Sequence, residues 1–183
     1  MAYGSIIPGL IIDGCPAPYG VVNERAVRAA AGIMFLVGIL AFFVIRSTGD
    51  YTALYVVVPL FWLDFFLKTV VDPRFSIFGV AGGWATRRQK PEWVGAAQKR
   101  FAWSIGLALS SIMLTASVFL HVRGWLPLTI CMICLTFMWM ESALGICAGC
   151  SIYAWLQRMG IVTVPEHQPA CPGGACQVRG SSR

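Results

Sequence analysis

Residues 125–153, WLPLTICMICLTFMWMESALGICAGCSIY, decide how this sequence is interpreted. The stretch is long and apolar enough to cross a bilayer, which takes about 20 predominantly apolar residues in a helix. It also contains one acidic residue, Glu141, and two Cys-x-x-Cys pairs, Cys131/Cys134 and Cys147/Cys150. A carboxylate within a bilayer is energetically costly and thiolates are reactive, so we expect the chemistry of this protein on this segment.

The composition of the whole chain is that of a membrane protein. Of its 183 residues, 57% are hydrophobic and only 12% are charged, whereas a soluble domain is about a quarter charged. We therefore expect an all-α integral membrane protein, a four-transmembrane-helix bundle with spans at about 26–45, 51–71, 101–122 and 125–153. The N-terminus lacks the basic region of a cleavable signal peptide, so the first span is expected to remain as an anchor.

The segments outside the spans predict one membrane domain and a tail. The long connection 72–101 holds many of the charges and a glycine-rich apolar stretch, Phe75–Trp84. This stretch is expected to lie at the membrane surface as a short amphipathic or irregular piece of a cytoplasmic loop. The membrane domain would then cover residues 1–158. Residues 159–183 are polar and rich in Pro and Gly, which predicts a flexible, cysteine-containing cytoplasmic tail.

The distribution of basic residues predicts the orientation in the membrane. Four spans put both termini on one side, together with Arg25, Arg28, Arg74, Arg87, Arg88, Lys90, Lys99, Arg100 and Arg158. The other side carries only Arg46 and Arg123. Because cytoplasmic loops carry the excess of Lys and Arg, both termini are expected in the cytoplasm. This bias accounts for the net charge of +6, and no nucleic-acid partner is expected.

Two acidic residues fall within the predicted spans. Asp64 has Lys68 four residues later, so their side chains share a helix face and can pair. Glu141 is expected to bond across to Arg74, to Arg100 or to a serine of the third span. Such residues are functional-site candidates by default, but contacts that hold helices together are the favoured interpretation for both.

The relation of Glu141 to the second cysteine pair depends on helix regularity. On a regular helix, Glu141 shares a stripe with Cys134 and Gly145, whereas Cys147 and Cys150 lie on another side. This geometry argues against Glu141 as a base for the dithiol, unless the helix breaks at Gly145.

The cysteine pairs differ in their surroundings. Cys147 and Cys150 lie at the predicted cytoplasmic end, three residues apart, close enough for a disulfide or a shared metal. A redox dithiol, a soft-metal site, a sulfur carrier and simple packing all remain open. Cys131 and Cys134 lie deep among apolar residues, where packing is favoured.

The tail adds a further pair of thiols. Cys171 and Cys176 follow the second pair in the pattern C-x2-C-x20-C-x4-C, which resembles a tetrathiolate zinc or iron–sulfur site. Cys15 is an alternative ligand, and copper is a further candidate because several methionines accompany the thiols of the last span.

Several short pieces together resemble a known family. These are LDFFLK (63–68), DPRFS (72–76), QKRFA (98–102) and ESALGICAGCSIY (141–153), with a Cys-Pro ahead of Asn23-Glu24-Arg25. They resemble a bacterial membrane-protein family catalogued as domain of unknown function 4395, over most of residues 15–156. The resemblance implies a four-span protein of the bacterial cytoplasmic (inner) membrane. It draws attention to Cys15, Asp64, Arg74, Lys99, Arg100, Glu141, Cys147 and Cys150. Lys68 stands where the resemblance leads us to expect Arg, and the Cys171/Cys176 tail lies outside the shared region.

Three functional hypotheses follow. In the first, Cys147 and Cys150 exchange electrons, sulfur or a soft metal with a thioredoxin-like or sulfur-carrier protein, and Cys15 or the tail thiols act as a second station. In the second, the chain is a non-catalytic accessory subunit of a larger membrane complex. The third is a metal transporter. Nucleotide-binding and hydrolase motifs are absent from the sequence, so an enzyme of those classes is not expected.

Overall fold

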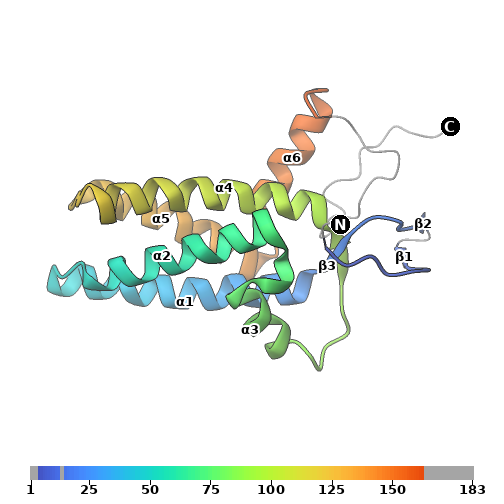
Figure 1. The fold of residues 1–183 in the computed structure, drawn as a ribbon, viewed down its shortest axis with the longest axis horizontal. Helices are drawn as coiled ribbons and strands as arrows, with labels where there is room; N and C mark the ends of the chain where they lie inside the picture. The colour runs from blue at the N-terminus through green and yellow to red at the C-terminus, as the bar shows by residue number, and fades with distance from the viewer. Residues whose placement is uncertain (1–3, 13–14, 163–183) are drawn as a thin grey trace.

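The computed structural model describes residues 4–12 and 15–162. Four long helices run side by side in it (Figure 1): α1, Glu24–Thr48; α2, Thr52–Phe66; α4, Ala96–Leu114; and α5, Trp125–Trp139. The last three each continue through a π-helical turn, at Leu67–Val71, Thr115–Phe119 and Met140–Leu144. The four resulting segments are long and apolar enough to cross a membrane, which confirms the helical, four-segment architecture.

The outer surface of these segments is apolar. Large side chains such as Leu40, Val56 and Phe119 are 65%, 65% and 72% exposed. Contiguous exposed apolar surface of this kind is rare on soluble monomers. This apolar surface agrees with four segments that are long and apolar enough to cross a membrane.

Glycines let the helices approach one another inside the bundle. A Cβ added at Gly38 of α1 would lie 2.8 Å from Leu135 of α5, and one at Gly106 of α4 would lie 2.6 Å from Phe65 of α2. Small residues at helix interfaces are the usual means of close packing in membranes, as expected here from the sequence.

Two short antiparallel ribbons stand outside the helices and were not expected from the sequence. Strand β1 (Ile11–Ile12) pairs with β2 (Cys15–Pro16), and β3 (Val21–Asn23) pairs with β4 (Trp93–Gly95). The second ribbon matters for the site, because β3 leads directly into α1 and β4 directly into α4. It therefore places the first turns of these two helices beside each other.

The apolar part of the long connection is a helix, α3 (Ile77–Ala85), packed on α1. Gly82 makes the approach possible, because a Cβ there would overlap the carbonyl oxygen of Ala26. The helix buries Phe78 and exposes Val80 and Trp84, so both of its faces are apolar. The expectation of an amphipathic loop is wrong for this stretch.

The fourth span is shorter than expected. The prediction of one span over 125–153 is wrong beyond Leu144, because Gly145 adopts φ +68° and ends the helix. A separate helix, α6 (Ala148–Arg158), follows and projects from the bundle at the end where β3 and the start of α4 lie (Figure 1). The second cysteine pair therefore lies at the start of this new helix and not on the segment Trp125–Leu144, which is long and apolar enough to cross a membrane.

Candidate functional site

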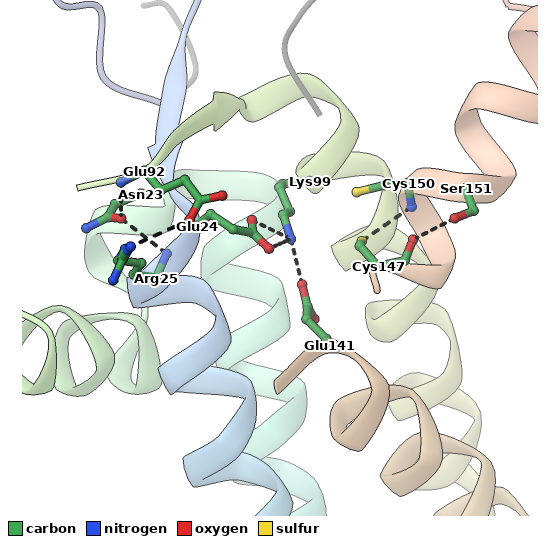
Figure 2. Close-up of polar contacts among 9 residues, drawn as sticks. All are labelled: Asn23, Glu24, Arg25, Glu92, Lys99, Glu141, Cys147, Cys150 and Ser151. Carbon is green, nitrogen blue, oxygen red and sulfur yellow. Dashed lines mark hydrogen bonds and ion pairs between the residues drawn. The ribbon is translucent and has the colours of Figure 1, made fainter. Parts of the chain in front are cut away.

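A buried cluster of three charges lies at this end of the bundle. The β3–β4 ribbon aligns the first turns of α1 and α4, which carry Glu24 and Lys99. Lys99 Nζ lies 2.8 Å from Glu24 Oε2 and 2.8 Å from Glu141 Oε1. Figure 2 shows the ammonium between the two carboxylates. The side chains of Lys99 and Glu24 are each 1% exposed, and that of Glu141 is 19% exposed.

The geometry explains how these charges tolerate burial. An isolated charge in a low-dielectric site is costly unless a partner and hydrogen bonds offset its desolvation. Lys99 supplies that partner to both carboxylates, and Glu24 also benefits from the N-terminus of α1, where negative charge is favourable. The cluster ties α1, α4 and the end of the fourth span together.

The partners expected for Glu141 were wrong. Arg74 Nη2 donates to the carbonyl of Gly4 at 3.1 Å, and Arg100 Nε donates to the carbonyl of Thr69 at 2.9 Å. Lys99 takes the place next to Glu141 instead. Its pairing with Glu24 was also missed, because it depends on the strand pairing of β3 with β4.

The break after the fourth span has a structural cause. Arg28 of α1 donates from Nη2 to the carbonyl of Ser142 at 3.3 Å, where the helix leaves its last carbonyls without intrahelical donors. A Cβ added at Gly145 would lie 3.0 Å from Nη1 of the same arginine. Glycine at this left-handed position thus ends the span against Arg28.

The Cys147/Cys150 pair occupies the N-terminus of α6. Cys147 is the N-cap residue, and its Sγ accepts a hydrogen bond from the backbone N–H of Cys150 at 3.3 Å. The two residues are 7% and 3% exposed. Between them, Gly149 packs on α4, where an added Cβ would lie 2.5 Å from Cβ of Ala102. Ala102 is one helical turn from Lys99, so the dithiol and the charge cluster are neighbours.

The two thiols differ in acidity. The hydrogen bond from the Cys150 thiol lowers the pKa of Cys147, and the Lys99 ammonium lowers it further against the effect of burial. The pKa of Cys150 is raised, because its S–H donates to Cys147 and because it is buried. A low-pKa thiol at a helix N-terminus beside a cation is the usual setting of a reactive cysteine.

A cavity of about 140 Å³ extends from the dithiol into the bundle. Cys147 and Glu141 line it at one end, and Leu54 and Met113 line it toward the other. Cys131 and Cys134 also contribute to its wall. We name this space the bundle cavity.

Residues 22–158 match the model of a family described as Domain of unknown function (DUF4395). The chain belongs to the DUF4395 family. No curated protein and no solved structure gave a significant match. The match to the DUF4395 model includes the charge cluster, the dithiol and the bundle cavity, and it begins after Cys15.

Asp64 lies elsewhere in the DUF4395 region, within contacts that join α2 to α3. It is 0% exposed, and its Oδ1 accepts from Ser76 Oγ at 2.7 Å and from the backbone N–H of Phe78 at 3.0 Å. Lys68 Nζ lies 2.6 Å from its Oδ2, as the i, i+4 spacing leads one to expect. Asp64 thus accepts hydrogen bonds from groups at the start of α3, which favours a structural role.

Only some of the cysteines proposed as metal ligands lie among the described residues. Among residues 4–12 and 15–162, no three His, Cys, Asp or Glu side chains gather in a way that could hold a metal ion. Cys171, Cys176 and the side chain of Cys15 lie outside the described residues. The tetrathiolate site for zinc or an iron–sulfur cluster therefore stays a prediction.

Proposed function

We propose that this DUF4395 protein is a membrane dithiol protein whose Cys147/Cys150 pair cycles between dithiol and disulfide. One observation carries the proposal: Cys147 Sγ caps α6 and accepts the Cys150 N–H at 3.3 Å, within a turn that also holds the second sulfur. In oxidation, two S–H bonds break, one S–S bond forms, and two electrons and two protons leave.

The unequal acidity of the thiols assigns them different roles. Cys147, with its lowered pKa, attacks one sulfur of a partner's disulfide as the thiolate, and the partner's other sulfur leaves as a thiolate. Cys150 then loses its proton and attacks Cys147 Sγ, which releases the partner's second thiolate and closes the disulfide. A thioredoxin-like protein is the partner class that this chemistry suits. The reverse sequence reduces the protein.

The charge distribution supports the orientation that we propose, with both termini in the cytoplasm of a bacterium. Arg25 and Arg28 begin α1 at the end where α6 starts, and the connection before β4 adds further basic residues. Arg46 lies in the last turn of α1 at the opposite end, and Arg123 lies over the ring of Tyr51, just before α2. Under the positive-inside rule, the dithiol end is the cytoplasmic one.

A redox titration tests the proposal. Purified protein is equilibrated in glutathione or dithiothreitol buffers of graded potential, free thiols are trapped with a maleimide, and peptides are identified by mass spectrometry. We expect a two-electron transition to a Cys147–Cys150 disulfide. Peptides that retain two free thiols at every potential would refute the proposal.

The chain offers a matched control for this experiment. Cys131 and Cys134 have the same spacing, but both lie on the transmembrane helix α5. The Cys131→Ser/Cys134→Ser variant is expected to keep the transition, and Cys147→Ser/Cys150→Ser to lose it. Metal analysis of the same preparations separates the redox proposal from soft-metal binding, because stoichiometric copurified metal would favour the latter.

A further inference from the structure

The bundle cavity extends from Cys147 into the apolar interior of the bundle. We propose that this cavity binds the ring of a lipid-soluble quinone, which accepts the two electrons of the Cys147/Cys150 dithiol. The proposal rests on the redox cycle proposed above and names its membrane-side electron acceptor.

The size of the cavity fits one ring. Its volume of about 140 Å³ is close to that of an engineered apolar cavity of about 150 Å³ that binds benzene. Along α4 its lining extends from Ala102 to Met113, which is roughly 16 Å of helix. The space is therefore elongated along α4, with its dithiol end near Ala102 and its far end near Met113.

The walls suit the same ligand. They are almost wholly apolar, and aromatic residues are prominent among them: Phe42, Phe61, Phe65, Trp103 and Phe137. Apolar walls with a few polar groups at one end are the usual form of a small-molecule site. Here the polar residues at the dithiol end are Cys147 and Glu141.

Access from the lipid is consistent with the packing of the helices. The cavity is lined by α1, α2, α4 and α5, and α4 packs against α5 less extensively than α2 packs against α4 or α1 against α5. A ligand that partitions into the hydrocarbon can therefore approach between α4 and α5. It reaches Cys147 without passing through water.

The reaction balances with a quinone. The Cys147 and Cys150 S–H bonds break, an S–S bond forms, and two electrons and two protons convert the two quinone carbonyls into the hydroxyls of a quinol. An acyl chain, which could also enter an apolar cavity, accepts no electrons. The position of a nucleophilic sulfur at the end of the cavity therefore favours the quinone.

The test uses the full chain, reduced and then freed of reductant under anaerobic conditions. Decylubiquinone is added, and its reduction is followed by ultraviolet absorbance. We expect one quinone reduced per protein with formation of the Cys147–Cys150 disulfide. Failure to reduce decylubiquinone, in a protein that does form this disulfide in glutathione buffers, overturns this inference and leaves the redox cycle standing. If the protein neither reduces decylubiquinone nor forms the disulfide in glutathione buffers, the redox cycle itself is refuted.

Two neighbouring substitutions on α4 make the test specific to the cavity. Leu109 lines it, whereas Ala108 is exposed on the bundle surface and does not. Leu109→Trp fills the space and is expected to slow quinone reduction about tenfold or more, whereas Ala108→Trp keeps the rate. Equal rates in both variants, with both shown to be folded by thermal unfolding, would also overturn the proposal.

Binding is tested separately from electron transfer. The Cys147→Ser/Cys150→Ser variant is photolabelled with an azido-quinone, and the labelled peptides are identified. Label on the cavity-lining parts of α4 and α5 that decylubiquinone competes away supports the site. A copurified acyl lipid that no quinone displaces identifies the cavity as a lipid site and contradicts the inference.

Discussion

Replacing Lys99 by Met removes the ammonium of the buried charge cluster while keeping a long, helix-compatible side chain. The ammonium lies 2.8 Å from a carboxylate oxygen of Glu24 and 2.8 Å from one of Glu141. Glu24, whose side chain is 1% exposed, cannot gain compensating hydration without opening the first turns of α1 and α4. We therefore expect Lys99→Met to be strongly destabilising.

The size of the effect follows from the burial of the pair. Removing one partner of a buried ion pair costs about 3–5 kcal/mol, because the other charge stays in a low-dielectric site. Since native domains are stable by only about 5–15 kcal/mol, the variant would lose a large part of its stability. Adding Glu24→Gln removes the stranded charge, so the double variant should recover stability with a coupling energy of about 1–3 kcal/mol.

Unfolding in detergent micelles with increasing sodium dodecyl sulfate, followed by tryptophan fluorescence, measures these free energies. Lys90→Met is the matched control, because Lys90 is an exposed lysine of the connection before β4. If Lys99→Met lowers the free energy of unfolding by less than about 1 kcal/mol, which is the range of exposed ion pairs, the reasoning is refuted. It is also refuted if the Lys99→Met/Glu24→Gln double variant is no more stable than Lys99→Met alone.

Three further predictions concern packing and the dithiol. Gly82→Ala should lower the melting temperature and reduce the free energy of unfolding by about 1–3 kcal/mol, because the added Cβ overlaps α1. Gly83→Ala should leave both unchanged, because a Cβ there has no atom within 4 Å. Alkylation of Cys147 by iodoacetamide, followed by mass spectrometry, should be half-maximal at a lower pH than alkylation of a free cysteine, whose pKa is about 8.5, because the pKa of Cys147 is lowered and its thiolate forms earlier as pH rises. An alkylation rate of Cys147 that rises with pH in the same way as that of a free cysteine would contradict this prediction. Glu141→Gln should make the reduction potential of the dithiol less negative. The expected change is about 30 mV for each unit by which the pKa of Cys147 falls. A potential that is unchanged or more negative in the glutathione titration would count against this prediction.

Local patterns in the sequence were sufficient for part of this structure. The four apolar segments follow from length and hydropathy, because a helix must satisfy its backbone within lipid. The pair Asp64–Lys68 follows from the i, i+4 spacing alone. Both depend only on residues close together in the chain.

The charge cluster could not be predicted in the same way. Its members come from the starts of α1 and α4 and the end of the fourth span, and a two-stranded ribbon of three-residue strands brings the first two together. Strands this short carry almost no periodic signal. Lys99 was noted only among the basic residues that predict the orientation and through the family resemblance, and Glu24 only within the Asn23-Glu24-Arg25 piece of that resemblance.

The break at Gly145 was equally hard to predict. Apolar residues continue on both sides of it, and a single glycine is tolerated inside transmembrane helices. The left-handed backbone of Gly145 and the Arg28 side chain beside it end the span. Their contact depends on the packing of α1 against the fourth span, which no local pattern reveals.

The position of the charge cluster beside the dithiol has a consequence for the redox cycle. With both carboxylates ionised, the cluster carries one negative charge in excess, and a Cys147 thiolate adds a second. The carboxylate of Glu141 raises the pKa of Cys147, while the Lys99 ammonium lowers it. Oxidation to the disulfide removes the thiolate charge, so Glu141 favours the oxidised form and Lys99 the reduced one. Removing Glu141 leaves Lys99 balanced by Glu24, which stabilises the thiolate and hence the reduced dithiol. The cluster therefore does more than hold three helices together, because its net charge helps to set the potential at which the dithiol gives up its electrons.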